Sequence, residues 1–420
     1  MSWRRLWIGL LFYLATSSAA HAQYLLVPMD GVQTNHLRAY GLAYWILQRG
    51  ERVEWLLNYR AGSFLLPDFE AARREAALRG VMVEPLSGAG LSTIRAEIGN
   101  SNMESVILEK PPRIAVYTPP NTRPWDDAVT LALAYAGVEY DRLWDPQVLG
   151  NKLVEYDWLH LHHEDFTGQF SKFYLTYAGA GWLQEEVARN RHLAASLGFS
   201  DPPSLKKAVA EKLREYVEDG GFLFAMCTAT ETIDLALAAV GVDIAASFAD
   251  GDGIEPNAEA RLDWTRALAF EGARLFENPS MSAFSDIDGH LVNTPMRQRL
   301  GTFRLFDFSA KIDPVATMLT QNHERVIKDY YGLTTSFRRS RLKPSVITLA
   351  EEPGMPWVKY LHGNYGQGTW TFLGGHDPED PQHVIGDPPT DLDLHPHSPG
   401  YRLILNNVLF PAAKKKHLKT

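Results

Sequence analysis

The sequence has a single cysteine, Cys227, among its 420 residues. One cysteine cannot form an internal disulfide, so the chain is not a disulfide-stabilised scaffold. The chain also lacks an H-E-x-x-H motif and paired cysteines, two patterns typical of zinc sites. The segment "SGAGLST" at 87–93 has neither the lysine nor the spacing of a phosphate-binding loop. Cys227 is therefore either a small buried side chain or a functional thiol.

Basic residues are fewer than acidic residues. Lysine and arginine number 41 against 50 aspartates and glutamates, which gives a net charge of −9. This balance argues against nucleic acid and against an anionic membrane surface as partners. The basic tail at 413–420 is too short to change that conclusion.

Long apolar runs are missing beyond residue 22, so the sequence predicts no integral membrane span in the mature chain. Residues 1–22 combine Arg4 and Arg5 with an apolar run from residue 6 to 15 and a final Ala-His-Ala. This pattern is typical of a signal peptide that is removed on export. We expect a mature chain that starts near Gln23 and is periplasmic or secreted.

Alternating strand and helix patterns indicate an α/β protein with two units. The first, at 23–110, is a small α/β unit with a strand, a helix and a second strand between 24 and 58. Residues 101–112 are interpreted as a linker. The second unit, at 111–412, alternates strands and helices, which predicts a parallel sheet with helices on both faces. An insertion of loops and short elements is expected at about 245–340.

Polar residues follow each predicted strand of the second unit. They occur in "TPPNTRPWDD", which contains Trp125, in "HLHHEDFTG", in "CTATET" and in "GGHDPED". Ligands of open parallel sheets bind beyond the carboxyl ends of the strands. We therefore expect these four segments to form one site, with Trp125, His163, Glu164, Asp165 and Thr228 binding the substrate.

Cys227 stands where the strand "FLFAM" gives way to a helical pattern. A thiol at a helix N-terminus has a lowered pKa, which favours the nucleophilic thiolate. Backbone N–H groups near Thr228 could bind an oxyanion. The alternative is a buried cysteine that acts only as a small apolar residue.

His376 follows two glycines at the end of another predicted strand, and acidic residues come directly after it. A histidine oriented by a carboxylate can act as a general base, so His376 with Asp377 or Glu379 is a candidate partner for Cys227. The alternative is a loop histidine whose acidic neighbours cap the next turn.

A third possibility is a metal site. The segment "HLHHED" places His160, His162, His163 and Glu164 within five residues. Imidazole and carboxylate ligands suit a zinc-type divalent ion, and His376 could complete the set. The alternative is that these histidines are interior polar groups with ordinary hydrogen bonds.

The first predicted strand is followed by "MDGVQTNHLRAYG", which carries Asp30, Gln33, Asn35 and His36. These side chains could hold a polar ligand at a helix N-terminus. A simpler interpretation is that Thr34 or Asn35 caps the helix.

The segment "GGFLFAMC", the helix after it and the distant "GGHDPE" resemble the class I glutamine amidotransferase-like family. The closing stretch "YGQGTWTFLGGHDPE…PGYRLILNNVLF" is similar to its ThuA-like branch, which is associated with sugar metabolism. The resemblance implies a flavodoxin-like parallel sheet, a nucleophile at Cys227 and a base at His376, with Asp377 or Glu379 as the acid. Alanines stand where the family has the two glycines that flank its nucleophile.

The whole chain also resembles exported bacterial proteins labelled asparagine synthetase B. Position 2 is Ser2, not the N-terminal cysteine of a glutamine-dependent synthetase, and no ATP-pyrophosphatase loop is present. Asparagine synthesis is therefore not expected. The leading hypothesis is an exported cysteine-dependent hydrolase of an amide, ester or sugar-derived substrate that needs no cofactor. The alternatives are a metal-dependent protein and a carbohydrate-binding protein without turnover.

Overall fold

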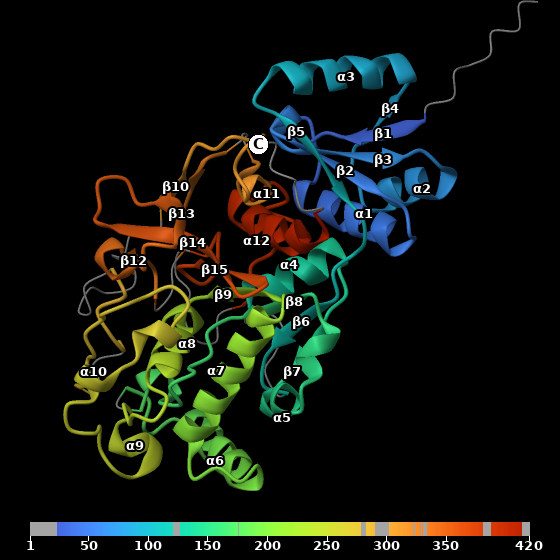
Figure 1. The fold of residues 1–420 in the computed structure, drawn as a ribbon. Coiled ribbons are helices and arrows are strands. Elements are labelled where there is room, and N and C mark those ends of the chain that lie inside the picture. The colour runs from blue at the N-terminus through green and yellow to red at the C-terminus, as the bar shows by residue number, and fades with distance from the viewer. Residues whose placement is uncertain are drawn as a thin grey trace, which may run out of the picture.

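The computed structural model describes residues 23–120, 127–174, 176–278, 283–289, 302–321, 324–328, 330, 334–380 and 388–413. The expected signal peptide at 1–22, Trp125 and the basic tail beyond Ala413 lie outside the described residues. Two β-sheets with helices between and around them make up the fold (Figure 1).

The N-terminal unit is built on a five-stranded antiparallel sheet with the order β4-β1-β3-β2-β5. Its elements are β1 (Tyr24–Val27), α1 (His36–Gln48), β2 (Val53–Leu57), β3 (Ser63–Pro67), α2 (Glu70–Leu78), β4 (Glu84–Leu86), α3 (Gly88–Asn100) and β5 (Glu104–Leu108). The predicted strand, helix and strand are present as β1, α1 and β2. The two strands do not pair, however, because β3 lies between them and runs antiparallel to both.

The helix α1 begins as its sequence predicts. Asn35 has an extended backbone, and its side-chain Oδ1 accepts a hydrogen bond from the Arg38 N–H at 2.9 Å. Asn35 is thus the helix cap. The interpretation of 101–112 as a linker is wrong, because strand β5 occupies its centre and pairs with β2.

The second sheet has ten strands, in the order β11-β10-β13-β14-β15-β9-β8-β6-β7, with β12 paired to β14. They are β6 (Ile114–Tyr117), β7 (Asp141–Leu143), β8 (Trp158–Leu161), β9 (Phe222–Met226), β10 (Phe303–Leu305), β11 (Val326–Ile327), β12 (Phe337–Arg338), β13 (Ile347–Glu351), β14 (Trp357–Tyr365) and β15 (Gly368–Leu373). Strands β7, β6, β8, β9 and β15 pair in parallel, whereas the remaining pairs are antiparallel. The predicted parallel sheet is therefore one half of a larger mixed sheet.

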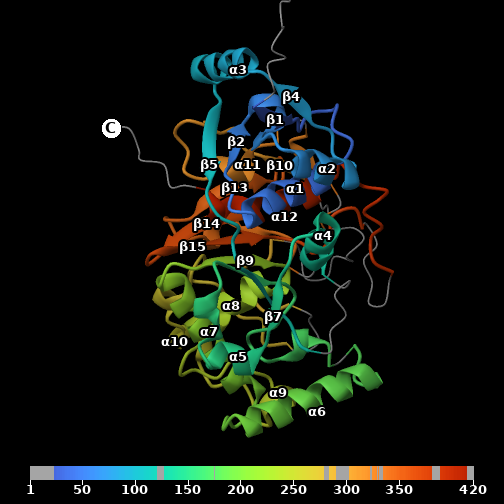
Figure 2. The same ribbon diagram turned by 90° about the vertical axis from the view of Figure 1, so that its right-hand side faces the viewer.

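Helices cover both faces of the parallel half (Figure 2). The helices of this unit are α4 (Ala128–Ala136), α5 (Asp145–Leu149), α6 (Gly181–Ser196), α7 (Pro202–Glu218), α8 (Thr228–Ala238) and α12 (Pro399–Leu409). On one face, α4 and α12 contact each other and α1 of the N-terminal unit; on the other, α7 contacts α5, α6 and α8. Alternate residues of β6 point to the two faces, so Val116 joins the first apolar core and Ala115 the second. The first core also contains N-terminal residues, so the two units are packed together.

The region at 245–340 contains the short helices α9 (Ser247–Asp250), α10 (Ala258–Arg261) and α11 (Ala316–Leu319). It also supplies β10 and β11, which extend the sheet beyond β13. This region is therefore partly built into the sheet.

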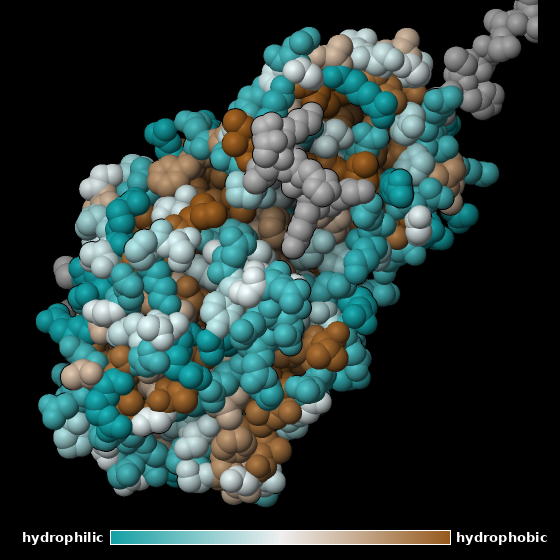
Figure 3. All heavy atoms as spheres, in the orientation of Figure 1, coloured by the Kyte–Doolittle hydropathy of each residue, from teal (hydrophilic) through white to brown (hydrophobic). Residues whose placement is uncertain are grey.

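The face in Figure 3 is mostly hydrophilic, with apolar residues in small separate groups. Among the described residues, no helix combines the length and apolar character needed to cross a bilayer.

Candidate metal centre

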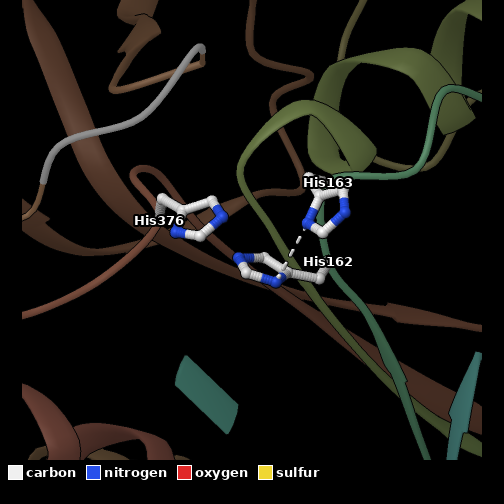
Figure 4. A group of neighbouring side chains, drawn as sticks. All are labelled: His162, His163 and His376. Carbon is white, nitrogen blue, oxygen red and sulfur yellow. Dashed lines mark hydrogen bonds between the residues drawn. The ribbon is translucent and has the colours of Figure 1, made fainter. Parts of the chain in front are cut away.

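Three histidines meet at the carboxyl end of the parallel strands. His162 and His163 come directly after β8, and His376 lies three residues beyond the end of β15. One ring nitrogen from each lies within 4.8 Å of the others. The rings of His162 and His376 are 4.0 Å apart between centroids, and His163 is 4.8 Å from His162 (Figure 4). The structure thus brings together histidines that are more than 200 residues apart in the sequence.

Burial makes this grouping chemically unusual. His162 and His376 are 3% and 5% exposed, whereas His163 is partly exposed. Figure 4 shows the His162 ring directed toward His376. The Nε2 atom of His162 is buried and has no hydrogen-bond partner among the described residues. A buried ring nitrogen normally has a partner, so the position calls for a group that accepts its lone pair.

A carboxylate stands behind this cluster. Asp127 caps α4 by accepting hydrogen bonds from the backbone N–H groups of Val129 and Thr130, at 2.7 and 3.3 Å. Its carboxylate oxygens also lie 3.2 Å from His160 Nε2 and 3.5 Å from His162 Nδ1. Burial alone would raise the pKa of Asp127, but the two histidines hold it well below the ordinary value. Asp127 is therefore an ionised group that can fix both rings.

His160 is turned away from the three-histidine cluster. Its Nδ1 lies 3.1 Å from the backbone oxygen of Phe224, and its Nε2 faces Asp127. The ring thus lies between a backbone oxygen and a carboxylate, with one nitrogen facing each. Asp127, His160 and His162 also bring ligand atoms within 4.8 Å of one another, but the two short separations to Asp127 are direct contacts. His160 thus belongs to the support of the cluster.

Cys227 has an unusual backbone at the turn from β9 into α8. Its φ of 52° and ψ of −138° are rare for a residue with a side chain. The turn is fixed by hydrogen bonds from the Cys227 N–H to the Gly375 oxygen, at 3.0 Å, and from the Ala229 N–H to the His162 oxygen, at 3.1 Å. The side chain is only 2% exposed, and its sulfur lies 3.6 Å from Thr228 Oγ1. A strained turn between a strand and a helix is the conformation from which hydrolases present a nucleophile.

The glycines before His376 are required by close packing. A Cβ atom at Gly374 would lie 2.5 Å from the backbone oxygen of Thr335, and Gly375 has a φ of 100°. These glycines let β15 end directly against the loop at 334–336, which sets the position of His376.

The two acids after His376 have other partners. The Tyr401 hydroxyl donates to Asp377 Oδ1 at 2.5 Å, and Glu379 Oε2 lies 3.5 Å from His395 Nδ1. These contacts tie the loop after β15 to α12 and to the residues before it.

The expected substrate-binding residues after β8 have distinct environments. Burial above all, together with Glu186 and Asp145 and against the opposing effect of Lys206, raises the pKa of Glu164 to about 8. Asp165 is a loop-organising residue: its carboxylate accepts hydrogen bonds from the backbone N–H groups of 167, 169 and 171, at 2.8, 3.0 and 2.9 Å. Thr228 is fully buried in the first turn of α8.

Sequence reasoning missed the role of Asp127. The signal was present, since this residue ends the polar segment after the first strand of the second unit and precedes a helical pattern. An acid at that position is usually only a helix cap, so the pattern alone does not indicate a further role.

Comparisons with known proteins give little further guidance. No protein-family model matches the chain, and no curated protein matches it significantly. Two solved structures from Salmonella typhimurium, the cytoplasmic proteins STM3548 and STM1381, align over 72% of this chain and all of their own length. Both are 11% identical to it, with TM-scores of 0.36 and 0.33.

A third similar structure is Gan42B, a GH42 β-galactosidase. It is 9% identical, and the alignment covers 73% of this chain and 31% of the enzyme with a TM-score of 0.28. TM-scores at this level assign neither a fold nor a function to the chain.

Proposed function

We propose that the protein is a metal-dependent hydrolase whose His162, His163 and His376 hold a zinc-type divalent ion. The observation that carries this proposal is the convergence of three ring nitrogens within 4.8 Å, two of them from buried side chains. Three nitrogen ligands with one open position are typical of catalytic zinc sites. An ion held there supplies Lewis-acid activation of a water molecule or of a carbonyl group.

The position of the cluster supports the proposal. Strand β6 has β7 on one side and β8 on the other, so the chain reverses its direction of travel across the sheet between β6 and β8. Asp127 follows β6, and His162 and His163 follow β8. Ligands of open α/β sheets bind at such a point. The parallel order β7-β6-β8-β9-β15 also agrees with a flavodoxin-like sheet, which we include in the proposal.

Residues of the chain would prepare the site for the ion. The Asp127 carboxylate would accept a hydrogen bond from His162 Nδ1, an atom that also lies 3.3 Å from His163 Nδ1, and this would leave the Nε2 lone pair of His162, on the side of His376, for the ion. Carboxylates in this position raise the basicity of metal-bound histidines and fix their orientation. His160 keeps Asp127 ionised. The substrate class, an amide, ester or sugar-derived compound, follows from the family resemblance of the sequence.

A second candidate is a thiol-dependent hydrolase, and the strained backbone of Cys227 favours it. In this mechanism the Cys227 thiolate attacks a substrate carbonyl, and His376 carries the proton to the leaving group. The acid that orients His376 would be Asp377 or Glu379, although their observed contacts are with Tyr401 and His395.

Hydrolysis of p-nitrophenyl acetate by the chain from Gln23 onward separates the two candidates. The metal proposal predicts activity that is lost with a chelator, restored by Zn²⁺, abolished in His162→Asn and retained in Cys227→Ala. His192→Asn is the matched control, because His192 is exposed on α6. Chelator-resistant activity that disappears in Cys227→Ala would establish the thiol mechanism instead. Activity that withstands all of these changes would contradict both.

A further inference from the structure

A cavity lies at the edge of the N-terminal unit, against the segment before α12, and shares no residue with the histidine cluster. Its volume is about 580 Å³, within the range of small-molecule sites. It is lined by Asp30, Gly31, His36, Asn58, Arg60, Ala61 and His397. These residues come from the loop between β1 and α1, the loop between β2 and β3, and the segment before α12. The cavity therefore lies where the N-terminal unit meets the second unit.

Its wall contains an unusual concentration of left-handed backbone. Asn58, Arg60 and Ala61 have φ values of 63°, 43° and 64°. A left-handed backbone at residues other than glycine is unfavourable and persists only where its surroundings fix it. Here the Asn58 N–H donates to Thr320 Oγ1 at 3.0 Å, and the buried Arg402 donates to the Ala61 oxygen. Strain of this kind concentrates at ligand sites, because it holds polar groups in a set geometry.

Asn58 also has a buried hydrogen-bond acceptor without a donor among the described residues. The residue is only 9% exposed, and its Nδ2 donates to the Asn102 oxygen at 3.0 Å. Its Oδ1 has no hydrogen-bond partner in the described part of the chain. A buried polar atom without a hydrogen bond is unfavourable. Since Asn58 lines the cavity, a hydroxyl group of a ligand there would supply the missing donor.

The charges around the cavity are balanced within the protein. The Arg60 guanidinium donates to Asp30 at 2.7 Å and to Glu84 at 2.8 and 2.9 Å. Two carboxylates on one guanidinium disfavour an anionic ligand. His36 Nε2 donates to the Asp30 backbone oxygen at 2.9 Å, and burial lowers the pKa of His36 to about 3, so its ring is neutral. The lining thus offers hydrogen-bond donors and acceptors without a strong net charge.

We infer that this cavity binds a neutral polyhydroxylated molecule of monosaccharide size. Hydroxyl groups donate and accept hydrogen bonds at once, which suits a wall of carboxylate, amide, imidazole and guanidinium groups. The inference is independent of the metal proposal, because it uses none of the residues of the histidine cluster. It also gives a function to the polar segment at 29–36, which the helix cap at Asn35 explains only in part.

The test is saturation-transfer NMR on the chain from Gln23 onward. The probes are glucose, galactose and mannose, with glucosamine and glucuronate as charged counterparts. The variant Gly31→Trp blocks the cavity, since a Cβ atom at Gly31 meets no atom within 4 Å. Gly253→Trp is the control, because Gly253 is equally open and lies in the loop between α9 and α10. We expect at least one neutral sugar to bind, glucuronate to bind at least about tenfold more weakly, and Gly31→Trp alone to abolish binding.

A second variant keeps the test conclusive if Gly31→Trp fails to fold. Asn58→Gly keeps the left-handed backbone and removes the amide, so it should weaken binding by about tenfold. The proposal is overturned if none of the three neutral sugars binds, if glucuronate is preferred, or if binding is unchanged in both Gly31→Trp and Asn58→Gly. Loss of hydrolase activity in a histidine variant with sugar binding intact would separate this site from the proposed metal centre.

Discussion

Glu231 provides a quantitative test of the packing beneath the Cys227 turn. It lies in the first turn of α8, is 1% exposed, and accepts hydrogen bonds from Ser285 Oγ at 2.6 Å and Thr334 Oγ1 at 3.1 Å. Burial, with a contribution from Asp288, raises the pKa of Glu231 from 4.5 to about 8. At neutral pH the folded chain therefore holds a proton that the unfolded chain has released.

The sign of the pH effect follows from this proton. Between about pH 4.5 and 8 the folded state binds more protons than the unfolded state, so stability decreases as the pH rises through that range. Keeping Glu231 protonated at pH 7 costs roughly 3 kcal/mol relative to the unfolded chain. The variant Glu231→Gln has no such proton to hold, and its amide can bond to both hydroxyls by accepting from one and donating to the other.

Thermal unfolding at pH 5.5 and pH 8 measures the difference. The natural chain should lose more stability between the two pH values than Glu231→Gln, by a few degrees in Tm. The control Glu218→Gln changes an exposed carboxylate at the end of α7 and should leave the pH dependence unaltered. Equal pH dependence in the natural chain and in Glu231→Gln would refute the assignment of a buried, protonated Glu231.

Three further predictions concern the frame of the site. Gly375→Ala should destabilise the fold by at least about 2 kcal/mol in urea unfolding, because Gly375 has a φ of 100° and a Cβ there would lie 2.8 Å from a backbone oxygen. The control Gly99→Ala, at a helix position with open space around it, should be neutral or stabilising. Lys206→Met leaves the buried Asp145 carboxylate without its cation and should lower the free energy of unfolding by about 3–5 kcal/mol in the same assay. Lys212→Met removes an exposed ion pair and should lower it by about 1 kcal/mol or less. Asp127→Asn should weaken Zn²⁺ binding about 10–100-fold in competition titrations, and unchanged affinity would exclude a supporting role.

Local sequence signals account for two helix boundaries. Of the two candidates Thr34 and Asn35, Asn35 caps α1, and α4 ends at Gly137 with a φ of 68°; both positions follow from side-chain and backbone preferences that act within a few residues. Strand β3 was missed because its place in the sheet depends on pairing with β1 and β2, which no local pattern records. Strand β5 was missed because a short, partly exposed edge strand between polar flanking residues looks like a linker in sequence.

The candidate site could be located from the sequence but not assembled. The rule that ligands bind beyond parallel strands singled out His162, His163 and His376 as residues of one edge. The direction of each side chain determines which of the residues at that edge contact one another. Asp377 is next to His376 in sequence, yet its carboxylate faces Tyr401, while Asp127, the cap of α4 after strand β6, reaches His162. Such pairings depend on strand order, which the sequence does not display.

The central claim is that the three histidines bind a metal ion, and metal stoichiometry tests it most directly. The chain from Gln23 onward would be loaded with excess Zn²⁺, passed over a desalting column and measured by inductively coupled plasma mass spectrometry. We predict about one zinc per chain in the natural protein and in His192→Asn, and close to none in His162→Asn or His376→Asn, as expected for a three-histidine centre. Zinc that is absent from the natural protein, or retained equally in all four proteins, would contradict the proposed centre.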